Sequence, residues 1–127
     1  MTDYTQLTVD TILCDSKKQL FIIQNKQKKW QLIHSSATAK ELLQAIRDSL
    51  WQDLGLSPNN YTILGGTTDE DDHKAFFAVQ LRPNSSIFLN DKRIRDSRFI
   101  TVDQVNEYIE EPEQVLMALR LFKAQAL

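Results

Sequence analysis

The sequence predicts a single domain of the α+β class, in which strands alternate with helices along the chain. Its 127 residues and 42% hydrophobic side chains suit one compact domain and leave no room for two full-sized ones. Several short apolar or alternating segments are typical of strands. Capping motifs followed by apolar stripes at helical spacing predict helices between and after those strands.

Three strands are predicted in the first part of the chain. Gln6 to Cys14 alternates between two faces, as a strand buried mainly on one face does. The turn residues Asp15 to Lys18 connect it to Leu20 to Ile23, a continuous apolar run that reads as a buried strand pairing with the first. Trp30 to Ile33 predicts a third short strand.

A helix is predicted to begin at Thr38-Ala39-Lys40-Glu41, because this tetrapeptide has the form of a capping box. Gly55 stands where a left-handed residue ends a helix, and polar Asp48, Ser49, Gln52 and Asp53 share a different part of its surface. Its apolar stripe consists of Ala39, Leu42, Leu43, Ile46, Leu50 and Leu54.

The second half adds strands and then two helices. Tyr61 to Leu64 and Lys74 to Leu81 are predicted strands, and Gly65-Gly66 permits a bulge after the first of them. Arg98 to Ile100 leads into a second capping box, Thr101 to Gln104, and a short helix.

A last amphipathic helix is predicted to begin with Pro112 at its first helical position.

Composition excludes several function classes. The chain has 3 glycines where average usage gives roughly nine, so no glycine-rich phosphate loop can be written. A net charge of −2 argues against nucleic acid and anionic membranes as partners. Cys14, His34 and His73 are too few for a four-ligand zinc site, and a single cysteine forms no internal disulfide. With no apolar run of membrane-spanning length and no signal-peptide pattern, a cytoplasmic location is expected.

Three segments stand out beside the order of the elements: Trp30-Gln31-Leu32, the helix ending Asp53-Leu54-Gly55-Leu56, and the late segment Arg98 to Val105. Together with that order, they resemble the Nudix (MutT-like) superfamily. The resemblance covers nearly the whole chain, residues 1–127. It implies a single Nudix-like domain, an α/β/α sandwich with a central mixed sheet.

The Nudix box itself is degenerate. It reads Gly, five residues, Glu, seven residues, Arg-Glu, an aliphatic, one residue, Glu-Glu, one residue, Gly and an aliphatic. Anchored on Gly55-Leu56, only Leu50 and Asp53 match it further, with Asp53 in the second place of the Glu-Glu pair. The remaining places hold His34, Lys40, Asp48, Ser49 and Gln52.

The resemblance implies hydrolysis of a diphosphate linkage by magnesium ions held on helix carboxylates. Only Asp53 stands at one of the usual ligand places of the helix, whereas Asp48 stands at the arginine place. Asp53 and Asp48 are the candidate catalytic residues, and Asp53, Asp48 and Glu41 are the makeshift metal ligands if the protein is active. Neutral Ser49 and Gln52 predict a poor magnesium site, so Mg²⁺ is a doubtful cofactor. Ligand contacts are predicted for Trp30, His34, Ser35 and Glu41.

These residues also have plain structural interpretations. Asp48 and Asp53 suit a solvated helix face, His34 suits a loop without special role, and Trp30 suits the core. A substitute metal site from the helix carboxylates and the acidic residues 69–72 is an alternative on charge alone.

Three functional hypotheses follow. The first is a Nudix-fold domain that binds a nucleotide-like ligand or a protein partner with weak or no hydrolysis. The second is an atypical magnesium-dependent hydrolase of a nucleoside diphosphate derivative. The third is an interaction domain that uses the lysine-rich hairpin Lys26 to Trp30. A homodimer is a further expectation from the resemblance.

Overall fold

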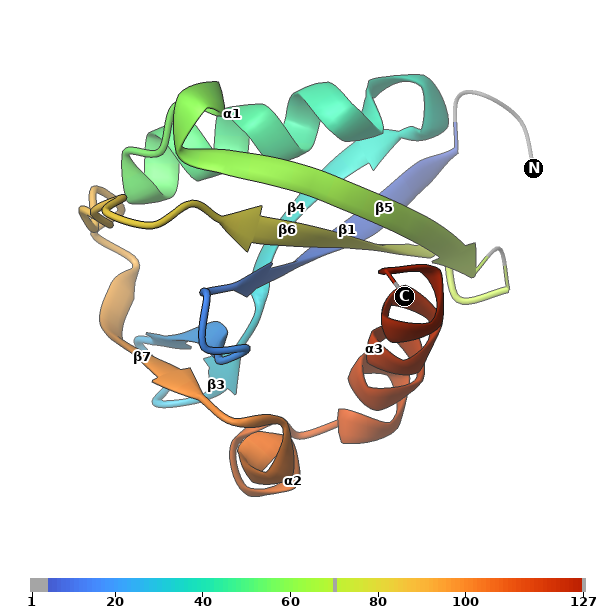
Figure 1. Cartoon of the computed structure of the whole chain (residues 1–127). Coiled ribbons are helices and arrows are strands. Elements are labelled where there is room, and N and C mark those ends of the chain that lie inside the picture. Colours follow the sequence, from blue (N-terminus) through green and yellow to red (C-terminus); the bar gives the residue numbers. More distant parts are fainter. Residues whose placement is uncertain (1–4, 70, 127) are drawn as a thin grey trace.

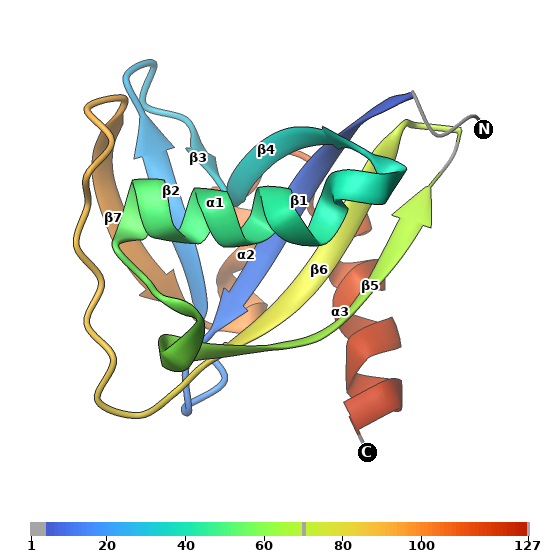
Figure 2. The ribbon, with the colours of Figure 1, turned by 90° about the horizontal axis from the view of Figure 1, so that it is seen from above.

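The computed structural model describes residues 5–69 and 71–126, with side chains placed through residue 120. It contains a mixed seven-stranded sheet. Helix α1 (Leu42–Leu54) lies over one face, and helices α2 (Val105–Tyr108) and α3 (Pro112–Ala126) lie on the other side (Figure 1 and Figure 2). This architecture confirms the predicted α+β class and the layered arrangement that the resemblance implies.

The strands follow the predicted order, with several differences in length. The first and sixth strands have the predicted bounds, the second, fifth and seventh extend beyond them, and the third is shorter than predicted. Short 3₁₀ turns occupy Ala39–Glu41, Pro58–Asn60 and Val102–Gln104. The strands are β1 (Gln6–Cys14), β2 (Leu20–Asn25), β3 (Trp30–Gln31), β4 (Ile33–Thr38), β5 (Tyr61–Asp69), β6 (Lys74–Leu81) and β7 (Ile94–Ile100).

Strand β1 organises the sheet. Strand β6 pairs with it in parallel from Thr8 to Cys14, and β4 pairs antiparallel with its first half. Strand β2 joins β1 through the Cys14–Leu20 pair, then continues with β3 and β7. Strands β4 and β2 therefore pair with different parts of β1: β4 pairs with residues 6–11, and β2 pairs with Cys14.

The segment after Trp30 is the main correction to the sequence-based expectation. The predicted strand from Trp30 to Ile33 is divided between β3 and β4, and residues 34–38 continue β4 and do not form a loop. His34 pairs with Asp10 of β1. Thr38 still pairs with Gln6, and no side-chain hydrogen bond caps the 3₁₀ turn that follows it. The predicted capping box at Thr38 is therefore wrong, and α1 begins at Leu42.

The other local signals are confirmed. Gly55 has φ +66° at the end of α1, and its N–H donates to the Trp51 carbonyl at 2.9 Å, as a left-handed helix terminus requires. The register between β5 and β6 shifts between Ile63 and Gly65, which is the predicted bulge. The capping box at Thr101 is present.

Two apolar clusters lie on the two faces of the sheet. Leu42, Ile46, Leu50 and Leu54 of α1 belong to the first cluster, whereas Leu43, predicted in the same stripe, is 45% exposed. The second cluster lies beneath α2 and α3 and includes Val105. Ala39 is also exposed, because it lies in the 3₁₀ turn before the helix. Within the described residues, no helix combines the length and hydropathy that crossing a membrane requires.

Candidate functional site

A groove of about 850 Å³ lies beneath α1. Its walls are α1, β4, the hairpin between β2 and β3, and residues 91–94 that precede β7. Five predicted site residues line this one groove: His34, Ser35, Glu41, Asp48 and Asp53. Its volume falls within the range of small-molecule sites in proteins.

The carboxylates of α1 are spread along one side of the groove. Glu41 precedes the first helical turn, and Asp48 is exposed on the helix. The side-chain amide of Gln44 donates to Asp48 at 2.8 Å, one turn away. Asp48 is therefore engaged with its own helix surface.

Asp53 occupies a more enclosed position at the end of α1. Ser49 is only 7% exposed, and its hydroxyl donates to Asp53 Oδ2 at 3.1 Å. Partial burial raises the pKa of Asp53, the Ser49 hydrogen bond opposes that shift, and the charge of Asp91 adds to it. Ser49 thus supports Asp53 and does not lie on the solvated helix face.

Asp91 and Arg93 complete this end of the groove, and no motif in the sequence marks either residue. Arg93 donates to both carboxylate oxygens of Asp91, with Nε to Oδ1 at 3.0 Å and Nη2 to Oδ2 at 2.8 Å. This bidentate contact lowers the pKa of Asp91. The backbone N–H of Asn90 donates to the Asp53 carbonyl at 3.0 Å, which holds the segment against α1.

Strand β4 supplies the opposite side of the groove. The Ser35 hydroxyl is buried and has no hydrogen-bond partner among the described residues. A buried hydroxyl without a partner is costly. His34 is exposed on β4, with its Nδ1 3.3 Å from the side-chain amide of Gln31.

The residues of the groove do not fit a magnesium site. Mg²⁺ requires near-octahedral oxygen ligands, usually including carboxylates. No group of three or more histidine, cysteine, aspartate or glutamate side chains within the described chain is close enough to hold a metal ion. Of the acidic residues 69–72, Glu70 lies outside the described residues and the other three do not line the groove. Asp72 instead accepts a hydrogen bond from Gln114 at 2.8 Å.

Trp30 is separated from the other predicted ligand residues. It lines a second cavity, on the side of the sheet that faces α2 and α3. Its ring packs edge-on against Tyr108, with centroids 5.7 Å apart, and the Arg98 guanidinium lies 4.8 Å from its centroid. Trp30 is therefore partly core, and its role as a ligand contact stays a prediction.

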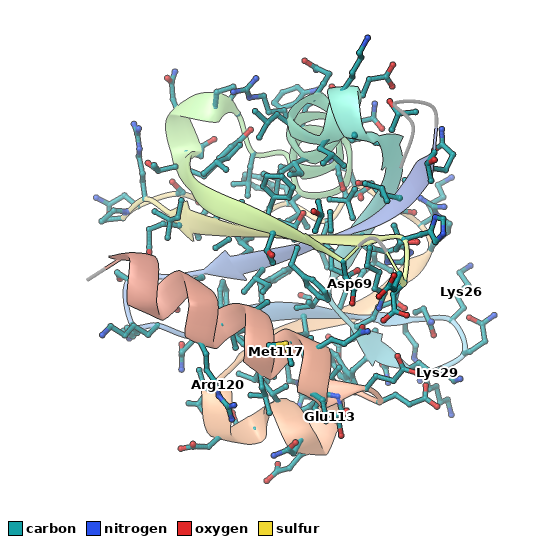
Figure 3. All side chains as sticks on the ribbon, turned by 90° about the vertical axis from the view of Figure 1, so that its right-hand side faces the viewer. Lys26, Lys29, Asp69, Glu113, Met117 and Arg120 are labelled. Atoms are coloured by element: carbon teal, nitrogen blue, oxygen red, sulfur yellow. The ribbon has the colours of Figure 1, made fainter. Side chains whose placement is uncertain are left out.

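The lysines of the hairpin are divided between the two cavities, and Lys29 shares the second cavity with Trp30. Lys26 and Lys29 extend from the hairpin between β2 and β3 at one edge of the molecule (Figure 3). Lys26 lines the groove, whereas Lys29 lines the second cavity and lies 3.5 Å from Glu110. The half-buried Trp30 leaves the lysines without an exposed aromatic neighbour in the hairpin.

Solved structures resemble this fold closely despite low sequence identity. A C. elegans Ap4A hydrolase has a TM-score of 0.73 at 11% identity, over 92% of this chain and 96% of that protein. A Nudix hydrolase from M. smegmatis has a TM-score of 0.66 at 11% identity, over 96% and 86%. The NUDIX domain of Shewanella oneidensis NrtR, complexed with ADP ribose, has a TM-score of 0.61 at 14% identity, over 90% and 85%. Neither a protein-family model nor a curated protein sequence matches the chain.

Proposed function

Since the chain has the Nudix fold, we propose that the groove beneath α1 binds a nucleotide-like small molecule and that metal-dependent hydrolysis is weak or absent. One observation carries this proposal: the groove is large and rich in hydrogen-bonding groups, but its carboxylates do not gather into a metal site. The structurally similar NUDIX domain complexed with ADP ribose supports a ligand of this class.

The side chains of the groove suit a polar ligand. The side-chain amides of Gln31 and Gln52 line the groove and can hydrogen-bond to sugar hydroxyls. Lys26 and Arg93 both line the groove, Lys26 at its hairpin end. Arg93 is already paired with Asp91, so Lys26 is the better candidate to bind an anion. Lys26 is therefore assigned to the phosphate of the ligand.

Calorimetry and thermal-shift measurements test this proposal. ADP-ribose, diadenosine tetraphosphate and nucleoside triphosphates are titrated with and without Mg²⁺ or Mn²⁺, while product formation is followed. Binding without metal and without turnover is expected. Lys26→Glu weakens binding, whereas Lys28→Glu on the same hairpin does not, since Lys28 lies outside the groove. Absence of binding by every nucleotide overturns the proposal.

An atypical hydrolase is the second candidate, because Glu41, Asp48 and Asp53 all line the same groove. The same measurements separate the two candidates. Turnover that is abolished by Asp53→Ala contradicts the binding function. No turnover, together with no thermal shift from added metal, contradicts the hydrolase.

A further inference from the structure

The second cavity has a floor built from three adjacent strands. Asp10 of β1 pairs with His34 of β4 on one side and with Phe76 of β6 on the other. Directly paired residues project from the same face of a sheet, so these three side chains form a row. The cavity measures about 290 Å³, and Trp30 and the first turn of α3 also line it.

Asp10 is the polar group at the centre of this floor. Its side chain is 16% exposed, and the Lys74 ammonium lies 3.7 Å from Oδ2, beyond hydrogen-bond distance. Lys74 instead donates to Gln114 Oε1 at 3.0 Å. Burial raises the pKa of Asp10, while Lys74 and His34 oppose that shift. The carboxylate therefore retains acceptor capacity within the cavity.

The two cavities meet at shared residues. Thr8, Gln31 and His34 line both the groove beneath α1 and the second cavity. Thr8 and His34 are exposed, so one ligand can extend from one cavity into the other around the edge of β4. The groove is large enough for the sugar and phosphates, and the smaller cavity suits a single ring system.

We propose that the second cavity binds an aromatic nitrogen heterocycle, with its ring against Trp30 or Phe76 and its N–H donors directed to Asp10. The inference rests on the proposed function, since the heterocycle is the base of the ligand whose remainder lies in the groove. Aromatic side chains favour a planar ring. A carboxylate accepts N–H donors and disfavours the oxygen-rich parts of a nucleotide. The Lys74 ammonium, next to Asp10, can donate to an adjacent ring carbonyl.

Three free nucleosides test the inference in the full chain. Guanosine offers two adjacent N–H groups, inosine offers one, and purine riboside offers neither. We expect affinity to fall in that order, and guanosine to bind at least about fivefold more tightly than purine riboside, the effect of one good bidentate contact. Asp10→Asn is expected to remove most of this difference. Asp103→Asn, an exposed site outside both cavities, leaves it unchanged.

The outcomes separate this inference from the proposed function. Equal binding of the three nucleosides by the wild-type chain overturns the assignment of Asp10 without any variant. Nucleotide binding that is weakened by Lys26→Glu but not by Asp10→Asn leaves the groove proposal intact and overturns this one. No binding of any nucleoside or nucleotide overturns both. Circular dichroism confirms that the Asp10→Asn chain is folded before its affinity is compared.

Discussion

At the residue scale, Gly55 shows the strongest conformational requirement. Its φ of +66° lies in the left-handed region, where a β-carbon costs about 1–2 kcal/mol. A β-carbon here would meet Phe88 Cβ at 3.5 Å, an ordinary contact, so the cost is one of backbone conformation. Gly55→Ala is therefore expected to lower the free energy of unfolding by about 1 kcal/mol. Chemical denaturation measures it.

The matched variant at the same position is Gly55→Asn. Asparagine tolerates the left-handed region better than alanine, so it should retain more of the stability. If alanine and asparagine destabilise equally, the backbone angle is not the cause and lost space beside Phe88 is.

The surroundings of Cys14 determine the reactivity of its thiol. Burial, followed by the charge of Asp15, raises the pKa of its thiol to about 11. Because the thiolate is the nucleophile, native Cys14 should react with a disulfide reagent at pH 8 at least tenfold more slowly than free cysteine. Denaturant should restore the rate. A native rate equal to that of free cysteine would contradict the burial of this thiol.

At the element scale, the end of α1 and the segment before β7 each carry a carboxylate, Asp53 and Asp91, and the pKa values of the two shift in opposite directions. The raised pKa of Asp53 means that its contribution to stability is present below the unfolded value near 3.8 and is lost as pH rises through the folded pKa. The lowered pKa of Asp91 gives the reverse, with a contribution lost as pH falls through its folded pKa.

Asp53→Asn should consequently stabilise the chain at neutral pH. The amide still accepts from Ser49 and removes the repulsion with Asp91. Since water screens a half-exposed carboxylate, the expected rise in melting temperature at pH 7 is small, about 1–3 °C. It should shrink as pH falls through the raised folded pKa of Asp53, because the native carboxyl then gains its proton. Asp48→Asn, on the exposed helix surface, serves as the control, and a lower melting temperature for Asp53→Asn contradicts the argument.

Elements defined by local signals were predictable from the sequence, and elements defined by distant partners were not. The helix end at Gly55 and the start of α3 at Pro112 depend on the conformation of one residue. Strand β4 has no alternating apolar pattern, and it is a strand because β1 pairs with it from Gln6 to Thr11. Thr38 forms no capping hydrogen bond although its extended backbone (φ −77°, ψ 164°) matches that of Thr101, whose capping box forms, so the backbone of the cap residue does not explain the difference.

At the scale of the whole molecule, the same distinction applies to the candidate site. Five of the six predicted site residues line the groove, because they come from one continuous stretch of chain, residues 34–53. Asp91 and Arg93 reach the groove only because residues 88–90 dock on the end of α1. Asp10 reaches the second cavity through the sheet register. No spacing in the sequence marks such residues.

The whole molecule is also predicted to unfold as one domain. The two apolar clusters lie on opposite faces of one sheet, and strands such as β1 contribute to both. In a Trp51→Phe background, Trp30 is the sole tryptophan and reports on the face that carries α2 and α3. Ile46 is fully buried on the α1 face, and truncating it to alanine should cost about 2–5 kcal/mol.

If the sheet couples the two faces, Ile46→Ala lowers the denaturation midpoint by the same amount in Trp30 fluorescence and in far-ultraviolet circular dichroism. Leu20→Ala, which truncates the cluster on the other face, should shift both signals together as well. A fluorescence midpoint that stays at the parent value in Ile46→Ala, while the circular dichroism midpoint falls, would show that the two faces unfold separately. In that case a ligand that spans both cavities would have to join two independently unfolding units. Its binding would then make the two unfolding midpoints coincide.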